Sequence, residues 1–224
     1  RLVGSEMCIR DRPNADFAQR DASVYFDASE LSQVVAVTQA PTLVTPGRLE
    51  LPALNTTEYL TVGSASEPLE VALSPQAEWC TAVVEGARMR IRVLTNLGAE
   101  RSVTLHVTAG RFTQDVVLVQ RAFDPVRNYG DGEVVALQRA TSGNGVCLVV
   151  VGDGYTLAEM ARGTGKYETD MRRAVEAFFS VYPYSAYRSY FDVYMLTAIS
   201  EEAGMSCVSP SETVDTKFST LWQG

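Results

Sequence analysis

The sequence is poor in the side chains from which metal and redox sites are built. It has one histidine, His106, and four cysteines among its 224 residues. The cysteines are widely separated and form no CxxC pair: Cys8, Cys80, Cys147 and Cys207. This spacing argues against a zinc knuckle or a redox dithiol and leaves a disulfide open. Long apolar runs are also missing, because the longest, residues 146–151, has the length of a strand and not the ~20 residues of a membrane helix.

Positive charge is scarce as well. The chain carries 19 Lys+Arg against 27 Asp+Glu, a formal net charge of −8, and only Lys166 and Lys217 are lysines. An acidic chain lacks the nonspecific attraction to phosphate backbones on which nucleic-acid binding depends, so nucleic acid is excluded as a partner. With 46% hydrophobic and 21% charged residues the composition is globular, and the length allows one large domain or two small ones.

The two ends of the chain predict an internal fragment of a longer protein. There is no initiator Met and no signal peptide, and residues 221–224 have no tail-like composition. Residues 1–12 contain LVGSEMCIRDR, which resembles a translated sequencing adapter. We interpret residues 1–12 as a cloning artefact and leave them out of the fold prediction.

An internal repeat relates residues 20–39 to residues 101–120 at an offset of 81 positions. Five pairs are identical: Arg20/Arg101, Ala28/Ala109, Gln33/Gln114, Val35/Val116 and Gln39/Gln120. A period of about 80 residues is too long for a solenoid and is typical of tandem small domains. We therefore predict the end of one copy at 13–41 and a complete copy at 42–122.

The complete copy has the period of two that a half-buried sheet requires. Met89, Ile91 and Val93 alternate with arginines, and the same alternation continues over 102–107. Further short strands are predicted at 59–62, 69–73, 79–83 and 113–119. Six or seven strands in about 80 residues predict an all-β immunoglobulin-like sandwich, with Trp79 as its core aromatic.

The pattern changes after residue 122, where 123–132 (FDPVRNYGDG) is predicted to be a linker. Strands are expected at 133–139, 146–151 and 191–199, with 146–151 fully buried. Thr156 and Glu159 form a capping box for a short helix. Apolar residues at helical spacing from Tyr167 to Tyr182 predict a longer helix that Pro183 ends. Residues 133–224 therefore predict the opening half of an α/β domain.

Asp153 is the candidate site residue, since it lies between two glycines directly after the strand 146–151. One interpretation is a tight turn whose carboxylate accepts backbone hydrogen bonds. The other is a contact to substrate or an ion, because sites in α/β sheets gather at the carboxyl ends of strands. A phosphate loop is disfavoured, since GDGY lacks both GxGxxG and the Walker lysine.

Other chemically active residues have simpler interpretations. His106 falls on the polar face of a strand, and a single imidazole does not make a metal site. Glu201 and Glu202 either line a cleft or lie on a solvated loop. Five tyrosines crowd thirteen residues, and packing is favoured over stacking on sugars or peptides: Tyr182, Tyr184, Tyr187, Tyr190 and Tyr194. The sequon at Asn55 is too common a pattern to carry weight.

The region 42–122 resembles the BACON domain, an immunoglobulin-like module of secreted bacterial proteins. The residues that carry the resemblance are Trp79, Asn96, Arg101 and Gln120, with Val107-Thr108-Ala109-Gly110. Such modules are often described as carbohydrate-binding, although many act as spacers. Residues 13–41 resemble the tail of another copy.

The region 133–224 is similar to the N-terminal part of the IgA-peptidase-like zinc metallopeptidases. The similarity lies in ordered blocks: VVGDGYT at 150–156, FF at 178–179, PY at 183–184, FDVY at 191–194 and SE at 200–201. The family binds Zn²⁺ on an HExxH helix, whose glutamate activates water. No HExxH occurs in these 224 residues. The resemblance therefore implies Zn²⁺ in the full-length protein, but no catalytic, cofactor or metal residue and no activity in this fragment.

Together these resemblances predict a fragment of a secreted or surface-anchored bacterial metallopeptidase that acts on a protein or glycoprotein. The alternative is a non-enzymatic adhesion protein whose sandwiches bind carbohydrate or mucin. An exposed row of aromatic residues would favour the alternative, and the sandwich offers Trp79 and Tyr59 as its large flat side chains.

Overall fold

The computed structural model of the protein describes residues 14–28, 31–63, 68–208 and 213–222. The chain divides into two compact units. The first comprises the described chain up to Leu49, Thr57–Arg92 and Ser102–Val119. The second comprises Glu50–Thr56, Val93–Arg101 and the chain from Gln120 onward. The predicted artefact at 1–12 lies outside the described residues.

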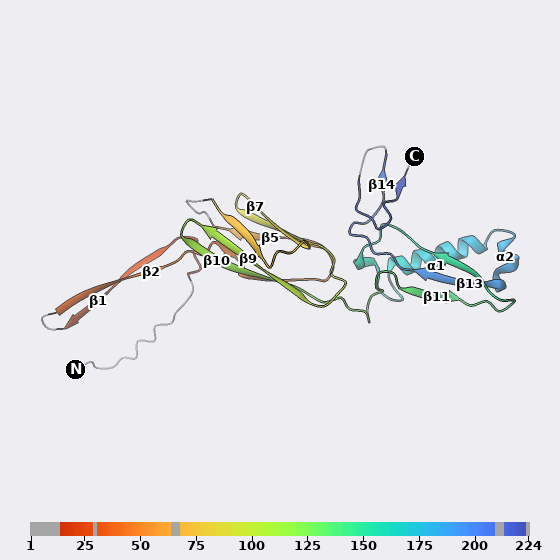
Figure 1. Ribbon diagram of the computed structural model, residues 1–224, viewed down its shortest axis with the longest axis horizontal. Helices are drawn as coiled ribbons and strands as arrows, with labels where there is room; N and C mark the ends of the chain where they lie inside the picture. Colours follow the sequence, from red (N-terminus) through yellow and green to blue (C-terminus); the bar gives the residue numbers. More distant parts are fainter. Residues whose placement is uncertain (1–13, 29–30, 64–67, 209–212, 223–224) are drawn as a thin grey trace. The chain divides into compact units, whose positions relative to one another are not determined.

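The internal repeat appears in the structure as two matching pairs of strands. β1 (Arg20–Ala28) and β2 (Leu31–Gln39) form an antiparallel two-stranded sheet in which Arg20 pairs with Gln39. β9 (Arg101–Ala109) and β10 (Phe112–Gln120) are neighbours in a larger sheet, and each lies 81 positions after its counterpart. Figure 1 shows β1 and β2 as a long ribbon. Side chains on this ribbon are exposed, including Tyr25 and Phe26.

Two four-stranded sheets follow, with strand orders β4-β10-β9-β6 and β3-β5-β8-β7 (Figure 1). The remaining strands are β3 (Val44–Thr45), β4 (Arg48–Leu51), β5 (Thr56–Val62), β6 (Glu70–Ser74), β7 (Cys80–Glu85) and β8 (Arg88–Val93). Met89, Ile91 and Val93 are buried on β8, as the alternation predicts. Two sheets with apolar inner positions are consistent with the predicted all-β sandwich.

Trp79 does not occupy the core position predicted for it. It lies in the turn before β7 and is only half-buried, whereas the next residue, Cys80, begins the strand and is 2% exposed. Side chains alternate between faces along a strand, and on β7 the more buried face carries Cys80, Ala82 and Val84, while Trp79 precedes the strand.

The C-terminal part of the chain contains a three-stranded sheet of order β11-β13-β12. β12 (Val146–Val150) and β13 (Phe191–Leu196) are parallel, and β11 (Val134–Gln138) is antiparallel to β13. The connection from β12 to β13 contains η1 (Leu157–Glu159), α1 (Lys166–Phe179), α2 (Tyr184–Tyr187) and η2 (Arg188–Tyr190). β14 (Ser206–Cys207) and β15 (Leu221–Trp222) form a short parallel pair (Figure 1).

α1 packs on the three-stranded sheet through one apolar face. Its buried apolar residues recur every four positions: Tyr167, Met171, Val175 and Phe179. They pack with β13 residues, including Val193 and Met195, which are fully buried. The predicted capping box is present, with Glu159 accepting from the Thr156 amide at 2.9 Å, although the capped element is a 3₁₀ helix.

α1 ends at Phe179, three residues before the predicted end at Tyr182. The residue before a proline is disfavoured in the helical conformation, so Pro183 excludes Tyr182 from the helix; Pro183 is itself the N-cap residue of α2. Among the described residues, no helix has both the length and the apolar character needed to cross a membrane.

Candidate functional site at the carboxyl end of the parallel strands

The parallel pair β12/β13 brings together residues that are far apart in the sequence. Val150 on β12 pairs with Met195 on β13, so the loops that follow both strands leave the sheet at the same edge. Asp153 lies on the first loop and Ser200 on the second. Carboxyl edges of parallel strands are where ligands gather in α/β sheets, which makes this edge the candidate site.

The Asp153 carboxylate accepts six hydrogen bonds from the protein. Oδ1 accepts from the Gly154 amide at 2.9 Å, the Phe218 amide at 3.2 Å and the Ser200 hydroxyl at 3.3 Å. Oδ2 accepts from the Thr216 hydroxyl at 2.8 Å and, in Thr220, from the hydroxyl at 2.6 Å and the amide at 3.1 Å. Internal donors therefore surround both oxygens.

These hydrogen bonds determine the ionisation of Asp153. Burial by itself would raise the pKa of the carboxyl group, but the hydrogen bonds from Thr220, Thr216 and Phe218 outweigh burial and hold that pKa well below its usual range. Asp153 is therefore a carboxylate at every physiological pH and has no proton to donate.

Gly154 explains why the turn has the sequence Gly-Asp-Gly. Its φ is +73°, in the left-handed region, and a Cβ at this position would lie 1.7 Å from the Gly204 carbonyl oxygen. The Gly204 amide also donates to the Gly154 carbonyl at 2.9 Å. A side chain at position 154 would thus separate the loops after β12 and β13.

A second carboxylate, Asp131, lies on the same edge; like Asp153 it stands between two glycines, but it precedes a strand, whereas Asp153 follows one. Its Oδ1 accepts from the Ile199 amide at 2.9 Å, and its Oδ2 lies 2.6 Å from the Lys217 ammonium. The Lys217 amide donates to the Ser200 hydroxyl at 3.0 Å. Residues 123–132 were predicted to be a linker, and they contain both Asp131 and the buried Tyr129.

Glu201 and Glu202 are half-buried on the loop after β13. Glu202 accepts from the Asp215 amide through its carboxylate at 2.9 Å, and its own amide donates to the Asp215 carbonyl at 3.0 Å. This pairing gives Glu202 a structural role in joining two loops.

A buried carboxylate that the sequence did not single out lies on α1. Glu168 is 6% exposed and accepts from the Tyr129 hydroxyl at 2.7 Å, the Gly163 amide at 2.8 Å and Arg172 Nε at 2.8 Å. Burial would raise the pKa of Glu168, but the hydrogen bonds from Tyr129 and Arg172 outweigh it and lower the pKa. A carboxylate with three strong donors stabilises the fold.

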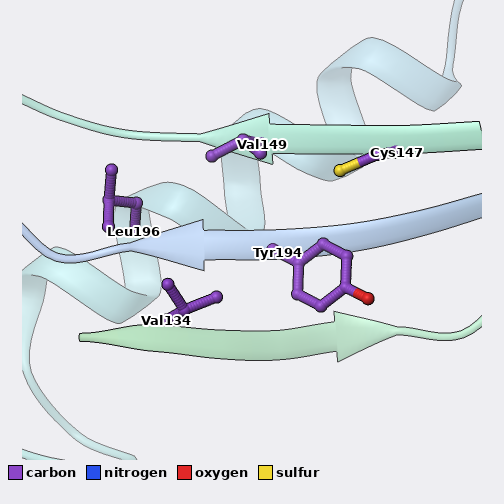
Figure 2. A pocket seen from close by; sticks show the side chains of 5 residues that line it. All are labelled: Val134, Cys147, Val149, Tyr194 and Leu196. Atoms are coloured by element: carbon purple, nitrogen blue, oxygen red, sulfur yellow. The ribbon is translucent and has the colours of Figure 1, made fainter. Parts of the chain in front are cut away.

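One face of the three-stranded sheet is open to solvent among the described residues. Figure 2 shows the side chains that line a shallow depression of about 430 Å³ on this face: Val134, Cys147, Val149, Tyr194 and Leu196. The prediction that 146–151 is fully buried is therefore wrong, because Val149 is 51% exposed. α1 packs on the other face and buries only alternate residues of β12.

Four of the five clustered tyrosines are exposed, which contradicts the packing interpretation for them. Their exposed fractions run from 42% to 80%: Tyr182, Tyr184, Tyr187 and Tyr190. α1 ends before Tyr182, and the other three lie in α2 and η2, which bury no side chain. Tyr184 is anchored by stacking on Phe178, with the ring centroids 4.2 Å apart.

Three polar residues of the sandwich motif, Arg101, Gln120 and Asn96, make side-chain hydrogen bonds near the strand ends. Gln120 is fully buried; its Oε1 accepts from Arg101 Nε at 2.8 Å and its Nε2 donates to the Leu94 carbonyl at 2.9 Å. The Asn96 amide donates at 2.8 Å to the carbonyls of Ala99 and Arg121. These residues, which carry the BACON resemblance, therefore link strand ends through side-chain hydrogen bonds.

The residues described do not provide a zinc site. Residues 14–28, 31–63, 68–208 and 213–222 contain no group of three or more His, Cys, Asp or Glu side chains placed to hold a metal ion. His106 lies on the exposed face of β9 as predicted, with Nδ1 2.6 Å from Asp115 Oδ1.

Residues 135–223 match the family model described as IgA Peptidase M64. The match includes β12, the Asp153 turn, α1 and β13. It supports an IgA-peptidase-like metallopeptidase fragment over these residues.

No curated protein matches the chain. Two similar solved structures are a Bacteroides ovatus GH5 xyloglucanase in complex with a XXXG heptasaccharide and a protein from Bacteroides thetaiotaomicron. The first is 21% identical with a TM-score of 0.32, and the match covers 36% of this chain and 19% of that chain. The second is 19% identical with a TM-score of 0.31, covering 38% and 83% respectively. At these TM-scores neither similarity bears on the fold or the function.

Proposed function

We propose that residues 133–224 are the N-terminal part of a zinc-dependent peptidase domain that cleaves a protein or glycoprotein. The observation that carries the proposal is the match of residues 135–223 to the IgA Peptidase M64 family. The parallel β12/β13 pair with its Gly-Asp-Gly turn supports it, because it supplies a carboxyl edge of the kind at which α/β enzymes place their sites.

The zinc ligands of this peptidase are proposed to come from residues outside these 224, since the sequence has no HExxH. The Zn²⁺ of the complete protein would polarise a peptide carbonyl and activate water. Asp153 is not proposed as a zinc ligand, because internal donors surround both of its oxygens.

We propose further that 42–122 is a BACON-type accessory domain and that 13–41 is the end of an upstream copy. The matching strand pairs β1/β2 and β9/β10 support the tandem arrangement. The side-chain hydrogen bonds of Arg101, Gln120 and Asn96 support the family, because all three motif residues bind groups at the ends of strands. An accessory module of this type implies a secreted or surface-anchored parent protein.

The decisive experiment is to sequence the parent gene beyond the codon for Gly224 and to assay the longer protein. We expect an in-frame HExxH, cleavage of protein substrates by the longer protein, and loss of cleavage on chelation with recovery on adding zinc. The 224-residue chain serves as the control and should neither bind zinc stoichiometrically nor cleave protein. An open reading frame without HExxH, or metal-dependent proteolysis by the 224 residues alone, would refute the proposal.

A second candidate function is glycan binding, and the exposed tyrosines favour it. Rings at Tyr182, Tyr187 and Tyr190 are more than 40% exposed, and the nearby Arg188 is neutralised by a bidentate ion pair with Glu176. An uncharged aromatic surface suits stacking against neutral sugars. A glycan array with the wild type and Tyr187→Ala tests this function, with Tyr25→Ala as an exposed-tyrosine control. If none of the three proteins binds any glycan on the array, the glycan-binding function is refuted.

A further inference from the structure

The segment 214–222, which we call the strap, lies against the carboxyl edge with little apolar burial. Phe218, Leu221 and Trp222 are more than half exposed, whereas Thr216 is the one strap residue that is buried, at 6%. A segment that buries so little apolar surface gains little stability from the hydrophobic effect. Its position therefore depends on polar contacts.

Four of those polar contacts converge on one carboxylate, while the end of the strap also pairs with β14, where the Ser206 amide donates to the Thr220 carbonyl at 3.2 Å. Of the six hydrogen bonds to Asp153, four come from the strap: the Thr216 hydroxyl, the Phe218 amide, and the hydroxyl and amide of Thr220. These donors lie 63 to 67 positions away along the chain. A tight turn needs only the Gly154 amide, so the turn by itself does not account for this arrangement.

The centre of the strap has a second anchor next to the first. The Lys217 amide donates to Ser200 Oγ at 3.0 Å, and the Lys217 ammonium lies 2.6 Å from Asp131 Oδ2. Ser200 itself donates to Asp153 Oδ1 at 3.3 Å, so the two anchors share one network. The start of the strap is held separately, through Asp215 and Val214, by Glu202 and Ser206.

We propose that Asp153 is a positioning residue that closes the strap over the carboxyl ends of β12 and β13, and that loss of its charge opens this edge. The inference about closure concerns only residues of this chain. The statement that closure controls access for a substrate rests on the proposed peptidase function.

The substitution Asp153→Asn removes the negative charge that holds the strap with almost no change in the shape of the side chain. An amide has one acceptor oxygen, and its nitrogen is a donor. Either orientation of the asparagine therefore places an N–H against donors that now point at a carboxylate oxygen. Because hydrogen bonds to a charged group are strong, removing them should raise the open population of the strap by about tenfold or more.

Because the chain has only two lysines, limited proteolysis can measure opening of the strap directly. An endoprotease that cleaves after lysine has two sites, Lys217 in the strap and Lys166 at the start of α1. In Asp153→Asn we expect cleavage after Lys217 to accelerate about tenfold or more while cleavage after Lys166 keeps its wild-type rate. Asp115→Asn, the same chemical change at an exposed carboxylate of β10, should leave both rates unchanged.

Two results would overturn the proposal. If cleavage after Lys217 in Asp153→Asn matches the wild type, Asp153 does not hold the strap. If both sites accelerate together, Asp153 supports the whole fold and not the strap in particular. Should Asp153→Asn fail to fold, Thr220→Val removes one strap donor at nearly constant shape and should still accelerate cleavage after Lys217 selectively. Since the assay needs no zinc and no peptidase activity, its failure is distinct from failure of the proposed function.

Discussion

The buried pair of Tyr129 and Glu168 offers a sharp test of the structure of the C-terminal part. The Tyr129 hydroxyl donates to Glu168 Oε2 at 2.7 Å, and both residues are 6% exposed. The substitution Tyr129→Phe removes this hydrogen bond and keeps the ring, including its contact with Arg162, whose Cζ lies 4.5 Å from the ring centroid. The experiment therefore measures one hydrogen bond to one buried carboxylate.

The magnitude follows from what remains around Glu168. A hydrogen bond to a charged group contributes about 1.5–3 kcal/mol. Glu168 keeps the Gly163 amide and Arg172 as donors, so it stays ionised and the cost falls at the lower end, about 1.5–2 kcal/mol. For a unit of this size, that loss corresponds to a decrease in Tm of about 5–10 °C.

The pH dependence adds a second signature. Because the pKa of Glu168 is lowered in the folded state, its stabilising contribution is present above its unfolded pKa and is lost as the pH falls through the folded pKa. Removing the Tyr129 donor raises the folded pKa, so Tyr129→Phe should lose this contribution at a higher pH than the wild type. The difference in Tm between the two proteins should then shrink in acid.

Thermal unfolding followed by far-UV circular dichroism at several pH values measures both effects. Tyr187→Phe is the matched control, because its hydroxyl belongs to a side chain that is 56% exposed, and it should change stability by less than about 0.5 kcal/mol. Equal Tm values for Tyr129→Phe and Tyr187→Phe would refute the reasoning. A loss of stability in Tyr129→Phe that persists unchanged at strongly acidic pH would refute the role assigned to Glu168.

Three further outcomes are expected. Gly154→Ala should destabilise the C-terminal part by about 3 kcal/mol or more, measured by thermal unfolding, because of its positive φ and the Gly204 carbonyl; a near-neutral result would contradict the turn geometry. Gln120→Ala should cost about 2–4 kcal/mol in urea unfolding, since it leaves Arg101 Nε and a buried carbonyl without Gln120 as partner. The pKa of Asp153 is lowered, so its contribution is complete above about pH 4 and is lost only in stronger acid; an NMR shift of the Thr220 amide with a midpoint at or above pH 4 would contradict this.

Several features could be predicted from the sequence because neighbouring residues determine them. Strand periodicity on β8 and β9 specified which side chains face inward, and Met89, Ile91 and Leu105 are buried accordingly. The offset repeat predicted two equivalent pairs of strands. The capping box at Thr156 and Glu159 formed as expected, since it involves only residues three positions apart.

Predictions about burial failed where burial depended on distant parts of the chain. The apolar run 146–151 has the composition of a strand covered on both faces, yet its outward residues are exposed because α1 covers one face of the described sheet. The packing predicted for the tyrosines after Val181 failed for a related reason. Only Tyr182 was expected on the long helix, which ends at Phe179, and the burial of the tyrosines in α2 and η2 depends on contacts with distant parts of the chain.

At the candidate site too, some features follow from the local sequence and others only from the tertiary structure. The sequence by itself determined that Asp153 lies in a tight turn after a strand, because two glycines and an apolar run are local signals. Only the tertiary structure decided which donors surround Asp153, since Thr216, Phe218 and Thr220 reach it from more than 60 positions away. Local patterns encode backbone conformation, whereas the partners of a carboxylate depend on how parallel strands bring separate loops to one edge.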